Sequence, residues 1–185
     1  MTREEYLNKA ARSLWPALVA AGATEPSAWR VSCGFPKGGR GNKRIGECWD
    51  ASASGDSTYE LFISPTIADS GVVLATLVHE LIHAGVGLKC GHKGAFKTVA
   101  RAAGLVGKLT ATTAGPELQA RLNVIIADIG AYPHAAMTLA VRIKQGTRMI
   151  KCECQECGYT CRTTAKWLDT GTPLCHCNSE PMAIA

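Results

Sequence analysis

The sequence lacks a hydrophobic run long enough to cross a membrane. A bilayer span needs about 20 consecutive apolar residues, and the longest candidate, residues 72–84, is interrupted by polar and charged side chains from Thr76 onward. The N-terminal residues include two early acids and no long apolar stretch before Arg12, which argues against a secretory signal. We therefore expect no membrane partner and a location in the cytoplasm.

Aromatic and charged residues are also scarce, at 6% and 19% of the 185 residues, whereas hydrophobic residues make up 46%. Such a chain can bury a core, which argues against disorder over its whole length. The length suits one domain of ordinary size with a small appendage. A net charge of +5 permits contact with nucleic acid but does not require it.

Cysteine, in contrast, is abundant and unevenly placed. Six of the nine cysteines fall between Cys152 and Cys177. In a reducing cytoplasm, clustered thiols indicate metal ligands rather than disulfides. Cys33 and Cys48 lie outside the cluster, and we interpret them as ordinary buried thiols, with a mutual pairing or a third metal site as alternatives.

Hydrophobic periodicity and turn residues predict a mixture of helices and short strands. In the segment 70–86, apolar residues recur at helical spacing between a cap at Asp69 or Ser70 and terminating glycines. Pro16 lies inside the first predicted helix and predicts a kink or an early end. The predicted helices are 3–22, 70–86, 94–104 and 116–129, and the predicted strands are 28–34, 45–49 and 59–64.

Within the predicted helix 70–86, His79 and His83 lie one turn apart on the same face, where both imidazoles can bind one ion. Glu80 follows the first histidine and projects beside the ion, where it can accept a proton from zinc-bound water. Two histidines on a helix face without a metal are the alternative. The capped apolar helix and the downstream histidine favour the metal site.

A catalytic zinc normally takes three protein ligands and keeps one open position. We predict His92 as the third ligand, because glycines on both sides of it allow the chain to return toward the helix. Cys90 lies in the same loop and is interpreted as an ordinary thiol rather than a ligand. The other candidates for the third ligand are His134, His176 and Asp128.

The C-terminal cluster predicts a second, structural zinc site. Cys154 and Cys157 form a Cys-x-x-Cys pair followed by glycine, and Cys175 and Cys177 follow at an interval typical of a zinc ribbon. Cys152 is the alternative to Cys154 as first ligand. So short a segment with few large apolar residues needs a metal to fold. We therefore expect two zinc ions per chain, one catalytic and one structural.

The stretch His79-Glu80-Leu81-Ile82-His83-Ala84, followed by Gly91-His92-Lys93-Gly94-Ala95-Phe96, resembles the SprT-like metallopeptidase domain. That family includes Spartan, the protease of DNA–protein crosslinks. The resemblance covers about residues 5–180 and is strongest at 72–104. It implies that His79, His83 and His92 bind the catalytic zinc and that Glu80 is the catalytic base.

The resemblance also implies an α+β fold. This fold is a minimal zincin in which a small, partly antiparallel sheet packs on the motif helix, with a C-terminal zinc ribbon. The strand near 59–64 would lie along the cleft as an edge that pairs with the substrate backbone. The expected division is a metallopeptidase domain at 1–140, a basic linker at 141–150 and a ribbon at 151–185. Small proteins of this kind are commonly encoded by bacteriophages, so the expected compartment is the cytoplasm of a bacterial or phage-infected cell.

Two further features have alternative interpretations. Tyr132 and His134 are candidates by residue type for stabilising the oxyanion, although a structural turn explains them better. Two basic stretches, combined with the aromatic Trp167, are candidate contacts for single-stranded nucleic acid, with solvated surfaces as the alternative. The candidate contact residues are Lys37, Arg40, Lys43, Arg44, Lys151, Arg162 and Lys166.

These observations together favour a monomeric, zinc-dependent endopeptidase that acts on proteins or peptides, with DNA-associated proteins as candidate substrates. The main alternative is a zinc-binding module associated with DNA, RNA or transcription that has little or no proteolytic activity. A hydrolase of cell-wall amides is a third hypothesis, and the missing export signal argues against it.

Overall fold

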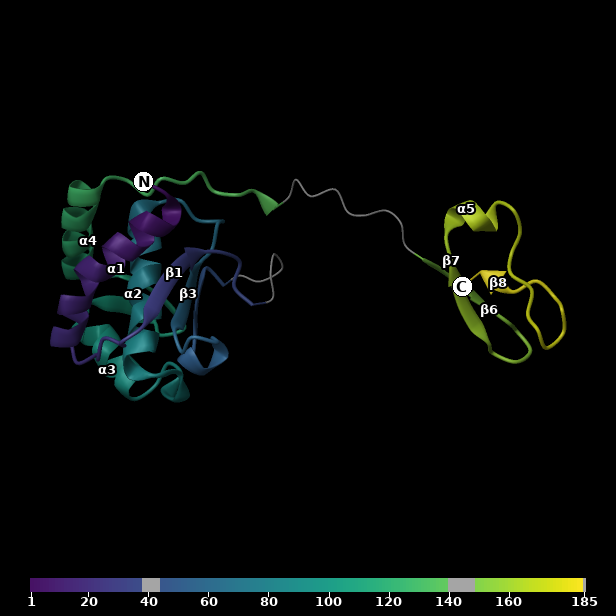
Figure 1. The fold of residues 1–185 in the computed structure, drawn as a ribbon, viewed down its shortest axis with the longest axis horizontal. Helices are drawn as coiled ribbons and strands as arrows, with labels where there is room; N and C mark the ends of the chain where they lie inside the picture. Colours follow the sequence, from purple (N-terminus) through teal and green to yellow (C-terminus); the bar gives the residue numbers. More distant parts are fainter. Residues whose placement is uncertain (38–43, 140–148, 185) are drawn as a thin grey trace. The chain divides into compact units, whose positions relative to one another are not determined.

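The computed structural model describes residues 1–37, 44–139 and 149–184. The chain forms two compact units, Met1–Ala140 and Val141–Ala185 (Figure 1). Both units combine helices with small sheets, so the fold is of the α+β class. None of the helices in the described part of the chain is both long and apolar enough to cross a bilayer.

The first unit is built on a three-stranded sheet. Its strands are β1 (Trp29–Cys33), β2 (Gly46–Trp49) and β3 (Tyr59–Ile63), in the order β1-β3-β2, with β1 parallel and β2 antiparallel to β3. The sequence-based placement of residues 59–64 at a cleft edge is therefore wrong. β1 pairs with the far side of β3, which makes β3 central and leaves β2 as an edge strand.

Helix α1 (Arg3–Ala20) packs against β1 and begins with a capping box. Thr2 Oγ1 accepts a hydrogen bond from Glu5 N, and the Glu5 carboxylate accepts one from Thr2 N. The helix continues past Pro16, so the predicted early end is wrong. Buried Trp15 and Leu18 flank the proline, and burying such side chains contributes about 1.5–3 kcal/mol each. Their burial offsets a proline cost of roughly 3 kcal/mol.

Helix α2 (Ser70–Val86) lies at the centre of the first unit. It packs against the sheet on one side and against α1, α3 (Ala95–Ala102) and α4 (Pro116–Ile129) on the others. Asp69 caps it by accepting a hydrogen bond from Val72 N at 2.9 Å. Because this helix is buried along most of its length, side chains that leave it toward a cleft have a rigid base. Its fully buried side chains include Leu74, Leu77, Leu81 and Ile82.

A hairpin that the sequence did not predict follows α3. It consists of β4 (Leu105–Lys108) and β5 (Ala111–Ala114), paired antiparallel, and β5 packs against α2. The segment is too short and too mixed in polarity for a clear strand period. Strand β5 of the hairpin lines a cleft beside α2.

The second unit is small and holds few large apolar side chains. Its strands β6 (Ile150–Glu153), β7 (Thr160–Thr163) and β8 (Ala183–Ile184) form an antiparallel sheet in the order β7-β6-β8, accompanied by α5 (Ala165–Leu168). Its buried core consists of three cysteines and one methionine. A core of this size contributes little to folding by itself, which makes the cysteines important for stability. The core residues are Cys152, Cys154, Cys175 and Met182.

Candidate metal centres

Three imidazoles converge in the first unit. His79 and His83 project from successive turns of α2, and His92 returns from the segment before α3. The His92 Nε2 atom lies 3.2 Å from Nε2 of His79 and 3.2 Å from Nε2 of His83. Nitrogens around a tetrahedral zinc at 2.0–2.1 Å lie roughly 3.3 Å apart. The donor set and its spacing therefore fit a zinc ion.

Glycines bend the chain so that His92 can reach α2. The segment passes through a 3₁₀ turn, η3 (Leu88–Cys90), with Gly87, Gly91 and Gly94 at φ angles of 79°, 52° and 49°. Positive φ angles are readily available only to glycine. Cys90 turns its Sγ toward backbone carbonyls in this loop. Among the residues that the structure describes, the potential metal-binding group here consists of the three histidines.

Phe96 of α3 forms the apolar support of the histidine cluster. Its ring centroid lies 4.9 Å from that of His79, 4.2 Å from that of His83 and 5.0 Å from that of His92. The ring is fully buried. It therefore limits how far each imidazole can rotate and excludes water from that side.

Burial keeps the imidazoles in the neutral form that binds metals. It lowers the pKa of His79 to about 4 and that of His83 to about 3, and the neighbouring histidines lower both pKa values further. Burial also lowers the pKa of His92. Since a proton competes with a metal for the ring nitrogen, lowered pKa values favour metal binding near neutral pH.

Glu80 lies on α2 beside these ligands and is 5% exposed. Burial, and secondarily the charge of Glu47, raises the pKa of Glu80 to about 8, while Arg44 opposes the shift. In the metal-free chain the carboxyl group therefore holds a proton near neutral pH. A nearby divalent cation would favour the carboxylate.

This raised pKa predicts how the stability of the metal-free chain depends on pH. The unfolded chain releases the Glu80 proton near 4.5, whereas the folded chain holds it to about 8. Within this window the unfolded state binds fewer protons, so rising pH lowers the free energy of unfolding. Urea unfolding of the metal-free chain and of a Glu80→Gln variant should show the variant gaining relative stability from pH 4.5 to pH 8. A difference in unfolding free energy that does not change with pH would contradict the assignment. The contributions of the histidines to the pH dependence cancel in this comparison, because both proteins contain them.

The histidines and Glu80 open into a cleft of about 740 Å³. One wall is the edge strand β2 with the residues before it, and the opposite wall is the β4–β5 hairpin. Of the described residues that line the cleft, Arg44 is the only cation, and its guanidinium lies 2.7 Å from Glu47 Oε1. The cleft therefore combines a metal-binding floor with two strand walls.

Gly46 allows β2 to approach α2 this closely. A Cβ atom at this position would lie 2.5 Å from Glu80 Oε1 and 2.6 Å from Thr76 Cγ2. Contacts this short require the strand or Glu80 to shift. The absence of a side chain at Gly46 thus sets the width of the cleft beside Glu80.

Replacing Gly46 by Ala should destabilise the first unit by about 1–3 kcal/mol, the usual cost of overpacking, and should move Glu80. Urea unfolding of the zinc-loaded protein measures the first effect. Gly55→Ala is the matched control, because nothing lies within 4 Å of a Cβ there. Equal unfolding free energies for the two variants would show that β2 is not held tightly against α2.

The candidates for oxyanion stabilisation lie elsewhere. Tyr132 is 5% exposed and packs in the core with its ring 5.3 Å from that of Tyr6. His134 Nε2 lies 2.8 Å from the carbonyl oxygen of Pro65. Neither residue lines the cleft, so their contacts favour the structural turn over the oxyanion role. Their chain segment passes the opposite end of α2, where Tyr132 N donates to Ser70 Oγ.

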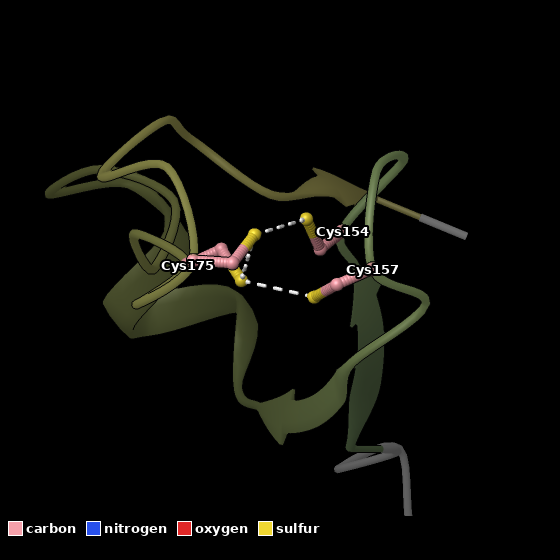
Figure 2. Close-up of side chains that lie close together, drawn as sticks. Cys154, Cys157 and Cys175 are labelled. Carbon is pink, nitrogen blue, oxygen red and sulfur yellow. Dashed lines mark hydrogen bonds between the residues drawn. The ribbon is translucent and has the colours of Figure 1, made fainter.

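Four cysteines converge in the second unit. In Figure 2 the labelled side chains of Cys154, Cys157 and Cys175 direct their sulfurs toward one another from two loops. The Sγ–Sγ distances are 3.6 Å for Cys154–Cys177, 3.5 Å for Cys157–Cys175 and 3.4 Å for Cys175–Cys177. Sulfurs around a tetrahedral zinc at 2.3 Å lie roughly 3.8 Å apart. The group therefore fits a zinc ion and supplies all four ligands.

Cys154, not Cys152, belongs to this group. Cys154 lies where β6 turns toward β7, and hydrogen bonds from the backbone N–H groups of Cys157 and Glu156 lower its pKa to about 7. Cys152 pairs in register with Cys161 across β6 and β7 and packs in the core with Met182. The lowered pKa favours the thiolate that a metal requires.

Comparison of the chain with protein-family models, curated proteins and solved structures finds no match. The chemistry of the two centres therefore rests on their own geometry.

Most of the described candidate nucleic-acid contacts already have partners. Arg44 pairs with Glu47, and Lys151 Nζ lies 2.5 Å from Glu153 Oε2. Lys37 and Lys166 lie over the rings of Trp49 and Trp167, at 5.8 Å and 5.3 Å from the ring centroids. Arg40 and Lys43 lie outside the described residues. Cys33 and Cys48 are free thiols, half-buried and buried respectively.

Thr112 and Gly46 belong to the candidate site but were not indicated by the sequence. Thr112 Oγ1 lies 2.8 Å from Nδ1 of His79. Thr112 lies on a strand that was not predicted, and Gly46 resembles any glycine at the start of a strand. Only the packing of β2 and β5 against α2 identifies them.

Proposed function

We propose that the chain is a zinc-dependent endopeptidase of the SprT-like type, with a minimal zincin fold in its first unit. The single observation that carries this proposal is the convergence of three imidazole Nε2 atoms beside the buried carboxyl of Glu80, at the floor of a cleft. Three histidines and an adjacent acid are the minimum set for zinc-assisted hydrolysis.

The ligand set supports a catalytic rather than a structural metal. Within the described residues the group contains three donors, one fewer than the closed sites of structural zinc. When bound, zinc supplies a Lewis acid and a water of lowered pKa. The Glu80 carboxylate would act as the general base that takes up a proton from water and as the acid that returns it to the leaving amine. His79, His83 and His92 would hold the metal in their neutral form.

The cleft suits an extended polypeptide as substrate. β2 is a sheet edge that lines the cleft beside Glu80, so its unpaired backbone groups can pair with an added strand. A folded substrate has few free backbone groups to offer. We therefore propose unfolded or extended segments of proteins as the substrate class, with DNA-associated proteins as candidates through the SprT-like resemblance.

The four-cysteine group supports a structural role for a second zinc. All four ligands come from the protein and the unit has a minimal core, so no position remains for a catalytic water. The proposed content is therefore two zinc ions per chain.

The deciding experiment compares the zinc-loaded chain with its Glu80→Gln variant on a denatured protein such as casein and on a DNA-bound protein. Fragments should appear with the wild type alone. If both proteins lack activity on every substrate while zinc binding persists, the binding-module hypothesis replaces the peptidase.

A further inference from the structure

A threonine from the β4–β5 hairpin holds His79 on the side away from its ligand nitrogen. His79 Nδ1 lies 2.8 Å from Thr112 Oγ1, while Nε2 of the same ring faces His92 at 3.2 Å. We propose that Thr112 is a positioning residue of the histidine site. Its hydroxyl oxygen accepts the Nδ1 proton of His79 and thereby keeps the Nε2 lone pair directed at the metal.

The chemistry of imidazole gives this contact its importance. A neutral ring has one proton, and the partner of one nitrogen decides which nitrogen carries it. A ring that binds a metal through Nε2 must keep its proton on Nδ1. A threonine hydroxyl can donate or accept a hydrogen bond. The proposed arrangement is the one in which Thr112 Oγ1 accepts, which keeps the proton on Nδ1 of His79 and leaves Nε2 for a metal.

The second histidine on α2 is held differently. Nδ1 of His83 is buried and has no hydrogen-bond partner. Its ring instead lies nearly parallel to Phe96, at 26° and 4.2 Å between centroids. Packing restrains the orientation of a ring but does not select a tautomer. Among the described residues, Thr112 is therefore the side chain that hydrogen-bonds the second ring nitrogen of a histidine on α2.

The strand geometry singles out Thr112 among its neighbours. Residues of β5 alternate between exposed and half-buried positions, and Thr112 is half-buried. Thr113 lies on the opposite face, as expected from the two-residue period of a strand. Thr113 also borders the cleft and shares the residue type, which makes it a matched control.

The inference rests on the three-histidine metal site of the proposed function, but not on peptide hydrolysis. Its test uses the full chain stripped of metal and titrated with zinc against a competing chelator. The ring signals of His79 are followed by NMR, which separates this site from the cysteine site. Thr112→Val should weaken zinc binding about 10- to 100-fold, whereas Thr112→Ser and Thr113→Val should bind nearly as the wild type.

A second measurement reads the tautomer directly. In the metal-free wild type, ¹⁵N chemical shifts should place the His79 proton on Nδ1, and Thr112→Val should shift it toward a mixture. This readout would not move if Thr112 only packed against the ring. Equal zinc affinity for Thr112→Val and wild type, or a wild-type His79 protonated on Nε2, would overturn the inference.

The outcomes also separate this inference from the proposed function. If Thr112→Val weakens zinc binding but the wild type cleaves no protein, the positioning role of Thr112 is supported and the peptidase proposal is contradicted. If Thr112→Val does not fold, two measurements still test the inference without it. These are the position of the His79 proton in the wild type and the zinc affinity of Thr112→Ser.

Discussion

Replacing Glu80 by Gln should lower the rate of peptide cleavage by about 10²- to 10⁴-fold, the usual contribution of a general base, while both zinc ions remain bound. Glutamine has nearly the same shape as glutamate, so it avoids new overlap with Gly46 in the narrow gap beside β2. What it lacks is the ability to accept a proton from water. Initial rates on a fluorescent denatured protein measure the loss.

Two comparisons isolate the role of the carboxyl group. Zinc content of wild type and variant should agree, which excludes loss of the metal as the cause. Asp50→Asn serves as a control for removing an acid, because Asp50 caps the short turn η2 (Ala51–Ala53) and is not among the residues that line the cleft. If Asp50→Asn lowered the rate as much as Glu80→Gln, the assignment of Glu80 as base would be wrong.

Replacing Cys154 by Ser should remove one of the two zinc ions and unfold the second unit. The buried core of that unit consists of three cysteines and Met182, which is too little apolar surface to hold a fold of this size without a metal. The NMR signals of residues 149–184 should lose their dispersion. Signals from the first unit should keep theirs, because its core and its histidine site are self-contained.

The reciprocal variant provides the control. His79→Ala should lose the other zinc ion and leave the second unit folded. Total zinc measured by atomic emission should therefore be two per chain for the wild type and one for each variant. A Cys154→Ser protein that kept both ions, or kept a folded second unit, would contradict a metal-dependent fold.

The helix that carries the proposed catalytic residues was predictable because several local signals agree there. Apolar side chains recur at helical spacing along residues 70–86, Asp69 provides the cap, and Gly87 provides the stop. The structure gives α2 these same limits. Strands β1 to β3 were likewise indicated by short runs of β-branched and aromatic residues bounded by turn residues.

The order of the strands was not predictable from such signals. Nothing in the residues 59–63 distinguishes a central strand from an edge, because both faces of β3 carry apolar side chains. Only the parallel pairing with β1 makes β3 central. The β4–β5 hairpin was missed for a related reason, since alternation over four residues is too short to establish a strand.

The metal ligands were predictable from residue type and spacing, whereas the residues that hold the ligands in place were not. His79, His83 and the Cys-x-x-Cys pair beginning at Cys154 occur at intervals that a metal imposes on a local stretch of chain. Thr112 reaches His79 from another part of the sequence. Contacts of this kind depend on tertiary packing, and no local pattern encodes them.

The open edge of β2 has a consequence for the solubility of the protein. The unpaired backbone groups of a strand edge can pair with a peptide, but they can also pair with a second copy of the same chain. Such pairing is the usual origin of edge-to-edge aggregation. β2 counters this risk by its shortness, Gly46–Trp49, and by charged residues at Arg44, Glu47 and Asp50. An antiparallel pairing of two copies centred on Glu47 would bring the two Glu47 carboxylates together, which disfavours it. A peptide segment without an acid at that position meets no such repulsion.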